Sequence, residues 1–174
     1  MNLSTAQKAT VKAWLDANAS ALSDDAAAAA LNAKASPAYL AWKSVVTRIE
    51  VQTSSGFDWT RVDNLSVGKA RIWDGLFNAT DSMPCNLGNY RTGINAVWVG
   101  TQADLDVRAA VNAACQRTVT VFEKLFATLT TTGPAQSGAR GASTNADTLG
   151  LDTSGAPIEG NISGQQVSDI RGGL

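Results

Sequence analysis

The fold class is decided by STAQKATVKAWLDA, residues 4–17, which carries the start signal and the apolar spacing of a helix. Ser4 and Gln7 stand at the spacing of a capping box, in which each side chain binds the backbone N–H of the other residue. Val11 and Leu15 follow at the i, i+4 spacing that places two side chains on one helix face. This stretch therefore predicts a helix with one buried face.

Similar start signals recur as far as residue 128. A Ser or Thr stands directly before acidic residues, directly before proline, or three residues before an acidic residue, and all three patterns are typical of helix N-termini. The signals and the apolar spacing after them predict further helices over about 23–34, 36–49, 64–77, 86–99, 101–116 and 120–128. The expected fold is therefore all-α, a compact bundle of six to seven helices. Gly68 and Gly75 lie inside one of these helices, and we expect close packing against another helix there.

The chain changes character after residue 130. Residues 131–174 contain no aromatic residue and nine of the fifteen glycines, and their larger apolar residues come singly between Gly, Ser and Thr. Such a segment buries too little apolar surface to offset its own ordering entropy. We therefore expect a helical domain at 1–130 and an extended Gly/Ser/Thr-rich C-terminal arm at 131–174, with a short helical turn at 165–170 on docking. The expected anchors of the arm on a neighbouring subunit are Leu149, Leu151, Ile158, Ile162, Val167 and Ile170.

One of the five tryptophans stands apart from the predicted helix faces. The other four lie on or beside predicted buried stripes and are expected in the core. Trp59 stands in a polar connector directly before Thr60 and Arg61. There it either anchors the connector to the core or is exposed at an interface. Trp59 and Arg61 are therefore candidate interface residues.

The chain contains no histidine, which removes the commonest general base near neutral pH and the catalytic arrangements built on it. Cys85 and Cys115 are too few for a disulfide framework or an all-cysteine zinc site, and we expect two reduced thiols in or near the core. We expect no cofactor, no metal and no catalytic residue, and therefore no enzyme. A catalytic alternative stays open, because Asp58, Asp63 and Asp74 could converge in space as a carboxylate site.

Charge and hydropathy limit the kinds of molecule that the protein is expected to bind. Fourteen basic and fifteen acidic residues give a net charge of -1 without charged blocks, so a basic recognition face for nucleic acid is not expected. A helical DNA-binding regulator stays open as a further alternative. No apolar run is long enough to span a bilayer, and the N-terminus lacks the regions of a signal peptide. We expect a protein made in a cytoplasm that contacts no membrane.

Three stretches match no catalytic signature but carry a family resemblance. They are DWTRVDNLSVGKARIW at 58–73, the stretch from CQR to EKLFA at 115–127, and EGNISGQQVSD at 159–169. In these stretches the chain is similar to small virion proteins of tailed bacteriophages. The expected architecture, a helical domain followed by a long C-terminal arm, resembles the adaptor or head-completion proteins of the phage neck.

The resemblance implies a structural role without a cofactor. Proteins of this class form a ring at the head–tail junction, typically twelve-fold, and insert their arms between or along subunits of the portal protein. The ring extends the DNA channel, so the DNA passes through it without sequence-specific recognition. The resemblance thus implies a virion protein that is assembled in the bacterial host cytoplasm. The alternative within the same class is another head or tail accessory protein, such as a tail terminator or a decoration protein.

Overall fold

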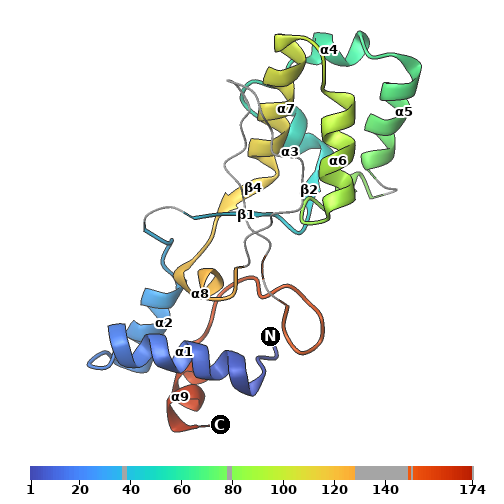
Figure 1. Ribbon diagram of the computed structural model, residues 1–174. Helices are drawn as coiled ribbons and strands as arrows, with labels where there is room; N and C mark the ends of the chain where they lie inside the picture. Colours follow the sequence, from blue (N-terminus) through green and yellow to red (C-terminus); the bar gives the residue numbers. More distant parts are fainter. Residues whose placement is uncertain (37–38, 78–79, 128–148, 150, 174) are drawn as a thin grey trace. The chain divides into compact units, whose positions relative to one another are not determined.

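The computed structural model describes residues 1–36, 39–77, 80–127, 149 and 151–173, and it is rich in helix with a few short strands (Figure 1). The chain forms two compact units. Among the described residues, unit 1 comprises 1–36, 39–41, 118–127, 149 and 151–173, and unit 2 comprises 42–77 and 80–117. The chain therefore begins in unit 1, forms unit 2 and returns to complete unit 1.

Three of the four helices described in unit 1 begin where the sequence signals predict, namely α1 (Thr5–Asn18), α2 (Asp24–Asn32) and α8 (Val121–Lys124). The fourth is α9 (Gly164–Gly172). The capping box at Ser4 is present, since the Gln7 side chain accepts from the Ser4 backbone N–H at 2.8 Å. Ser23 caps α2, and Ser163 begins α9 with a capping box of its own. The expected turn at 165–170 is thus part of a complete helix.

The core of unit 1 joins the two ends of the chain. α9 packs against both α1 and α2. The core contains Val11 and Leu15 from α1, Leu31 from α2 and Phe122 from α8. It also contains four aliphatic residues of the C-terminal segment, namely Ile158, Ile162, Val167 and Ile170.

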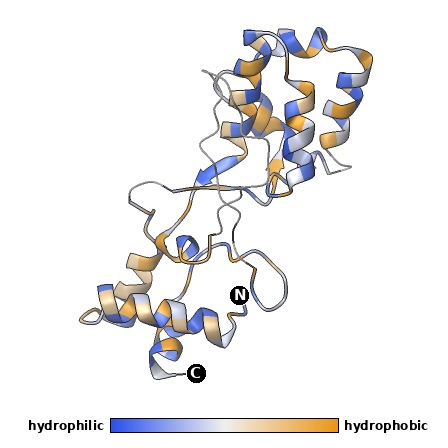
Figure 2. Cartoon of the chain, in the orientation of Figure 1, coloured by the Kyte–Doolittle hydropathy of each residue, from blue (hydrophilic) through white to orange (hydrophobic). Residues whose placement is uncertain are grey.

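Unit 2 contains the remaining helices. They are α3 (Arg48–Gln52), α4 (Trp59–Asp63), α5 (Val67–Leu76), α6 (Gly88–Val97) and α7 (Gln102–Ala114). α5 packs against α6, and α7 contacts α3, α4 and α6. Figure 2 shows polar and apolar residues alternating along these helices, as helices with one buried face require. Trp73 and Trp98 are buried in this unit, as predicted.

Short strands replace the helix that was predicted over 36–49. β1 (Leu40–Trp42) pairs with β4 (Gln116–Thr118), and the boundary between the two units runs through both strands. β2 (Val46–Thr47) pairs antiparallel with β3 (Ser82–Met83). The helix prediction was wrong because the backbone here pairs with segments far along the chain, and that pairing outweighs the local apolar spacing. The start of the predicted helix, at residues 37–38, lies outside the described residues.

The division of the chain differs from the expected boundary after residue 130. The described part of the predicted arm, residues 149 and 151–173, belongs to unit 1 together with the N-terminal helices. The physical reason is that its isolated aliphatic residues find a partner surface on α1, α2 and α8 of the same chain. The rest of the predicted arm, residues 131–148, 150 and 174, lies outside the described residues.

The helix–helix contact expected at Gly68 and Gly75 occurs at another glycine. A side chain at either of these positions would meet nothing within 4 Å. At Gly93 of α6, a Cβ would lie 2.6 Å from Cδ2 of Leu76 in α5. Gly93 is therefore the residue that permits the close contact between α5 and α6. Within the described residues, no helix is both long and apolar enough to cross a bilayer.

Candidate functional site

One end of unit 2 gathers the candidate interface residues. We define the α4 end as α4, the first turn of α5 and the connection between α6 and α7, residues 98–101. The α4 end is held together by side-chain contacts between these segments. Lys69 of α5 donates from Nζ to the carbonyl oxygen of Val99 at 3.0 Å. Arg61 of α4 binds the first turn of α7 through Asp104.

The Arg61–Asp104 ion pair is the best-defined polar contact of the α4 end. Arg61 donates from Nε and Nη2 to Oδ1 of Asp104, at 3.1 and 2.6 Å. The second carboxylate oxygen accepts from the backbone N–H and the hydroxyl of Thr101, at 3.1 and 2.9 Å, which completes the capping box of α7. Burial would raise the pKa of Asp104, but the hydrogen bonds from Arg61 and Thr101 outweigh it and hold this pKa below its ordinary value.

Aromatic packing supports the same end from inside unit 2. Trp73 and Trp98 pack edge to face with ring centroids 5.2 Å apart, and Phe57 stacks on Trp73 at 6.0 Å. Phe57 also makes an edge contact with Trp59 at 5.6 Å. Trp59 is nevertheless 54% exposed, so Phe57 anchors the connector and Trp59 faces solvent. Of the two interpretations of Trp59, the structure supports exposure.

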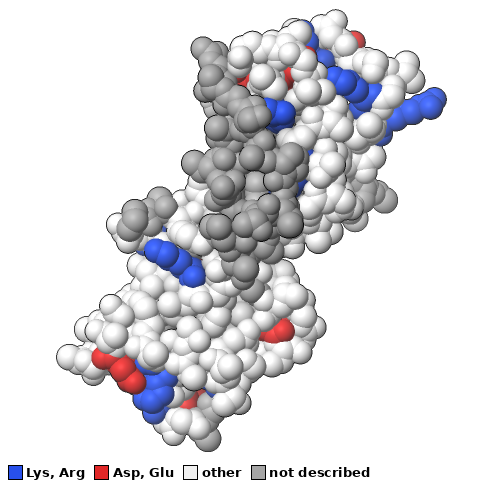
Figure 3. Space-filling view, viewed as in Figure 1, with Lys and Arg blue, Asp and Glu red and all other residues white. Residues whose placement is uncertain are grey.

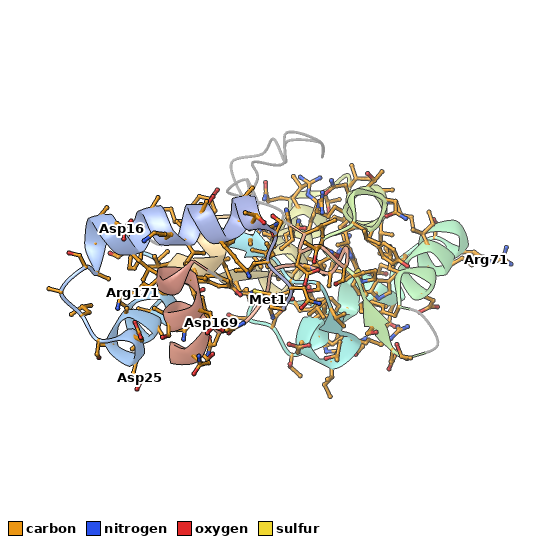
Figure 4. All side chains as sticks on the ribbon, turned by 90° about the horizontal axis from the view of Figure 1, so that it is seen from below. Met1, Asp16, Asp25, Arg71, Asp169 and Arg171 are labelled. Carbon is orange, nitrogen blue, oxygen red and sulfur yellow. The ribbon has the colours of Figure 1, made fainter. Side chains whose placement is uncertain are left out.

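Besides Trp59, two aliphatic side chains are exposed at the α4 end. Val67, the first residue of α5, is 71% exposed, and Val99 is 48% exposed. Together with Trp59 they form what we call the apolar triplet. In Figure 3, Lys and Arg side chains are the main charged groups seen on the face of unit 2 turned to the viewer. Figure 4 shows Arg71 projecting away from the body of α5.

The six predicted arm anchors differ in burial, and five of them are buried. Four of them belong to the main core of unit 1, and Leu149 is buried beside Ala41 and Val119 of the same unit. Leu151 is 56% exposed, and its carbonyl oxygen accepts from Gln7 of α1 at 2.7 Å. Five of the six residues therefore contribute to the chain's own core, and Leu151 is the one with an exposed side chain.

Polar side chains that the sequence analysis did not single out hold the C-terminal segment in unit 1. The Asn32 amide both donates to the Ile162 carbonyl at 2.8 Å and accepts from its N–H at 2.9 Å. Buried Glu123 accepts from the backbone N–H of Gly160 at 2.8 Å. Arg171 of α9 donates to the carbonyl of Ala19 at 2.7 Å and pairs with Asp24 at 2.6 Å. Each joins residues that lie far apart along the chain, so local spacing carries no signal for them.

Two of the three carboxylates that the catalytic alternative requires bind other groups of unit 2. Asp58 caps α4 by accepting from the backbone N–H of Thr60, and Asp63 is the last residue of α4. Asp74 pairs with Arg48, which also binds Asp81. Among the described residues, no group of three or more His, Cys, Asp or Glu could hold a metal ion.

Two pockets of the described structure lie in unit 1. One has a volume of about 210 Å³ and the other about 250 Å³. Both are lined by Lys8 of α1 and Ile170 of α9. Neither is lined by Asp58, Asp63 or Asp74, so they do not support a carboxylate active site.

Comparison of the chain with protein-family models, with curated proteins and with solved structures finds no match.

Proposed function

We propose that the protein is a structural virion protein, a head–tail connector or adaptor subunit of a tailed bacteriophage. Copies of the chain would form a ring, twelve-fold where it matches the portal protein beneath which it sits. The ring would join the portal to the tail and extend the DNA channel without recognising the DNA sequence. The site of action would be the head–tail junction of the virion, and the role requires no cofactor.

The observation that carries this proposal is the apolar triplet. Trp59, Val67 and Val99 are each about half or more exposed, and they stand on one end of unit 2. Tryptophan is enriched where protein–protein contacts are strongest, and Val67 and Val99 add exposed apolar surface at the same end as Trp59. The Arg61–Asp104 pair and the Phe57 packing hold the backbone beneath the triplet, so little ordering cost remains when a neighbour covers it.

The resemblance of residues 58–73 to phage virion proteins falls on the same surface. That stretch includes all of α4 and the first turns of α5, with Trp59, Arg61 and Val67. In this proposal the stretch is the subunit contact of the ring. Of the predicted arm anchors, Leu151 is the one whose exposed side chain is available to a neighbouring subunit.

The proposal is tested by weakening the triplet in the full-length chain. The double variant Trp59→Ala/Val67→Ala should form smaller assemblies than the wild type, because both side chains leave the contact. Light scattering after size-exclusion chromatography gives the mass. Leu22→Ala is the matched control, since Leu22 is an exposed aliphatic residue of unit 1. A wild type and a double variant of the same mass would contradict the proposed contact.

A further inference from the structure

The two cysteines of the chain meet inside unit 2. Cys85 lies between β3 and α6, and Cys115 directly follows α7. Both side chains are fully buried, and their Sγ atoms lie 2.6 Å apart. A disulfide bond is about 2.05 Å long, so closing one here requires a sulfur displacement of about half an ångström.

The backbone at each cysteine is held by hydrogen bonds from other segments. The Cys115 carbonyl accepts from the backbone N–H of Lys43 at 2.8 Å. The buried guanidinium of Arg91 donates to the carbonyls of Cys85 and Asn86, at 2.9 and 2.7 Å. Because both backbones are fixed, the approach of the two sulfur atoms is a property of the folded unit.

Other uses of a cysteine pair fit the site less well. A zinc site needs further ligands, the chain contains no histidine, and the described residues include no group of three or more candidate ligands. A cysteine that acts as a nucleophile in the folded unit requires a thiolate there, whereas the hydrogen bond with Cys115 and burial raise the pKa of the Cys85 thiol in the folded unit. The geometry instead suits a bond between the two sulfur atoms.

We propose that Cys85 and Cys115 are an oxidisable pair that closes an intrachain disulfide bond between the connection before α6 and the end of α7. With oxidised glutathione as the oxidant, one cysteine thiolate attacks the glutathione disulfide and releases one glutathione thiolate. The other cysteine then attacks the protein sulfur of the mixed disulfide and releases the second glutathione. One disulfide bond breaks and one forms, and two electrons and two protons pass from the cysteines to glutathione.

Burial determines when this exchange takes place. The oxidant reaches the thiols while unit 2 folds or when it opens locally, since neither sulfur is accessible in the folded unit. Once closed, the bond limits the unfolded chain between residues 85 and 115 and so stabilises unit 2. The inference concerns this unit alone and holds whether or not copies of the chain assemble.

The test compares two samples of the full-length chain, each unfolded in urea and refolded, one in oxidised glutathione and one in dithiothreitol. Each sample is then denatured in the presence of iodoacetamide, which alkylates free thiols. Intact mass spectrometry counts the alkylated cysteines. We expect no alkylated cysteine after oxidation and two after reduction, with the oxidised chain lighter by two hydrogen atoms before alkylation. We expect the oxidised sample to melt about 5–10 °C above the reduced one.

The matched variants are Cys85→Ala, Cys115→Ala and the double variant. Their melting temperatures should not depend on dithiothreitol, because no intrachain bond can form. Two alkylated cysteines in the wild type after refolding in oxidised glutathione would overturn the proposal. Glutathione adducts or disulfide-linked dimers in place of the intrachain bond would overturn it as well.

Discussion

At the scale of single residues, a few polar side chains decide how distant segments of the chain meet. Arg171 ties α9 to the turn between α1 and α2, and it does so with two hydrogen bonds to backbone carbonyls and one ion pair. Asn32 and Glu123 bind the backbone of the C-terminal segment in the same unit. Such bonds contribute to stability because they leave few buried polar groups without a partner.

Arg171→Ala should lower the free energy of unfolding of unit 1 by about 1–3 kcal/mol, because charge-assisted hydrogen bonds to partly buried groups are lost. Urea denaturation followed by circular dichroism measures the change. Arg71→Ala is the control, since this side chain is exposed and projects away from α5 (Figure 4). Equal effects of the two substitutions would mean that the Arg171 contacts contribute nothing.

The Asp104 carboxylate should make unit 2 sensitive to acid. Its pKa is lowered in the folded chain, so its contribution to stability is present above the ordinary pKa of about 3.9 and is lost as the pH falls further. The wild type should therefore be more stable than Asp104→Asn at pH 7, and the difference should shrink toward pH 2–3. Urea midpoints across this range measure it, and a difference that does not change with pH would contradict the ionic contribution.

At the scale of elements, the sequence predicts helix starts better than it predicts packing. The boxes at Ser4 and Thr101 begin α1 and α7 because a capping box is complete within four residues. The helix expected over 36–49 fails because strand pairing with residues 82–83 and 116–118 is not encoded locally. In the candidate site, the sequence singled out Trp59 and Arg61, whereas Val67 and Val99 became part of it only through the fold.

The two glycine positions give a test of helix packing. Gly93→Ala should destabilise unit 2 by about 1 kcal/mol or more, because the new methyl group would overlap the buried Leu76 side chain and outweigh the helix propensity of alanine. Gly75→Ala should stabilise it by about 0.5–1 kcal/mol, since nothing lies within 4 Å of the added atom. Thermal melts measure the change in melting temperature for each variant. A change of the same sign in both variants would contradict the assignment of the close α5–α6 contact to Gly93.

At the scale of the whole molecule, the C-terminal segment is part of the fold of unit 1. Composition alone suggested an arm, because the segment cannot form a core by itself. Its aliphatic residues are nevertheless sufficient once α1 and α2 supply the other half of the core. The contact between these aliphatic residues and α1 and α2 is not encoded in the local sequence, so composition alone does not predict it.

Two predicted anchors separate a core role from an assembly role. Ile158→Ala should lower the free energy of unfolding by about 2–5 kcal/mol, because it leaves a cavity in the core of unit 1. Leu151→Ala should change it by less than about 0.5 kcal/mol, since the side chain is mostly exposed. Chemical denaturation measures both values. A small effect of Ile158→Ala would show that the C-terminal segment is not held in unit 1.

The central proposal, a subunit that assembles into a ring, is tested most directly by the mass of the assembled wild-type chain. Native mass spectrometry of the full-length protein over a range of concentrations measures the number of copies. We predict one closed oligomer of a single copy number, twelve where the ring matches a twelve-fold portal, because head-to-tail contacts that close give one defined size. A chain that remains monomeric at every concentration would contradict it.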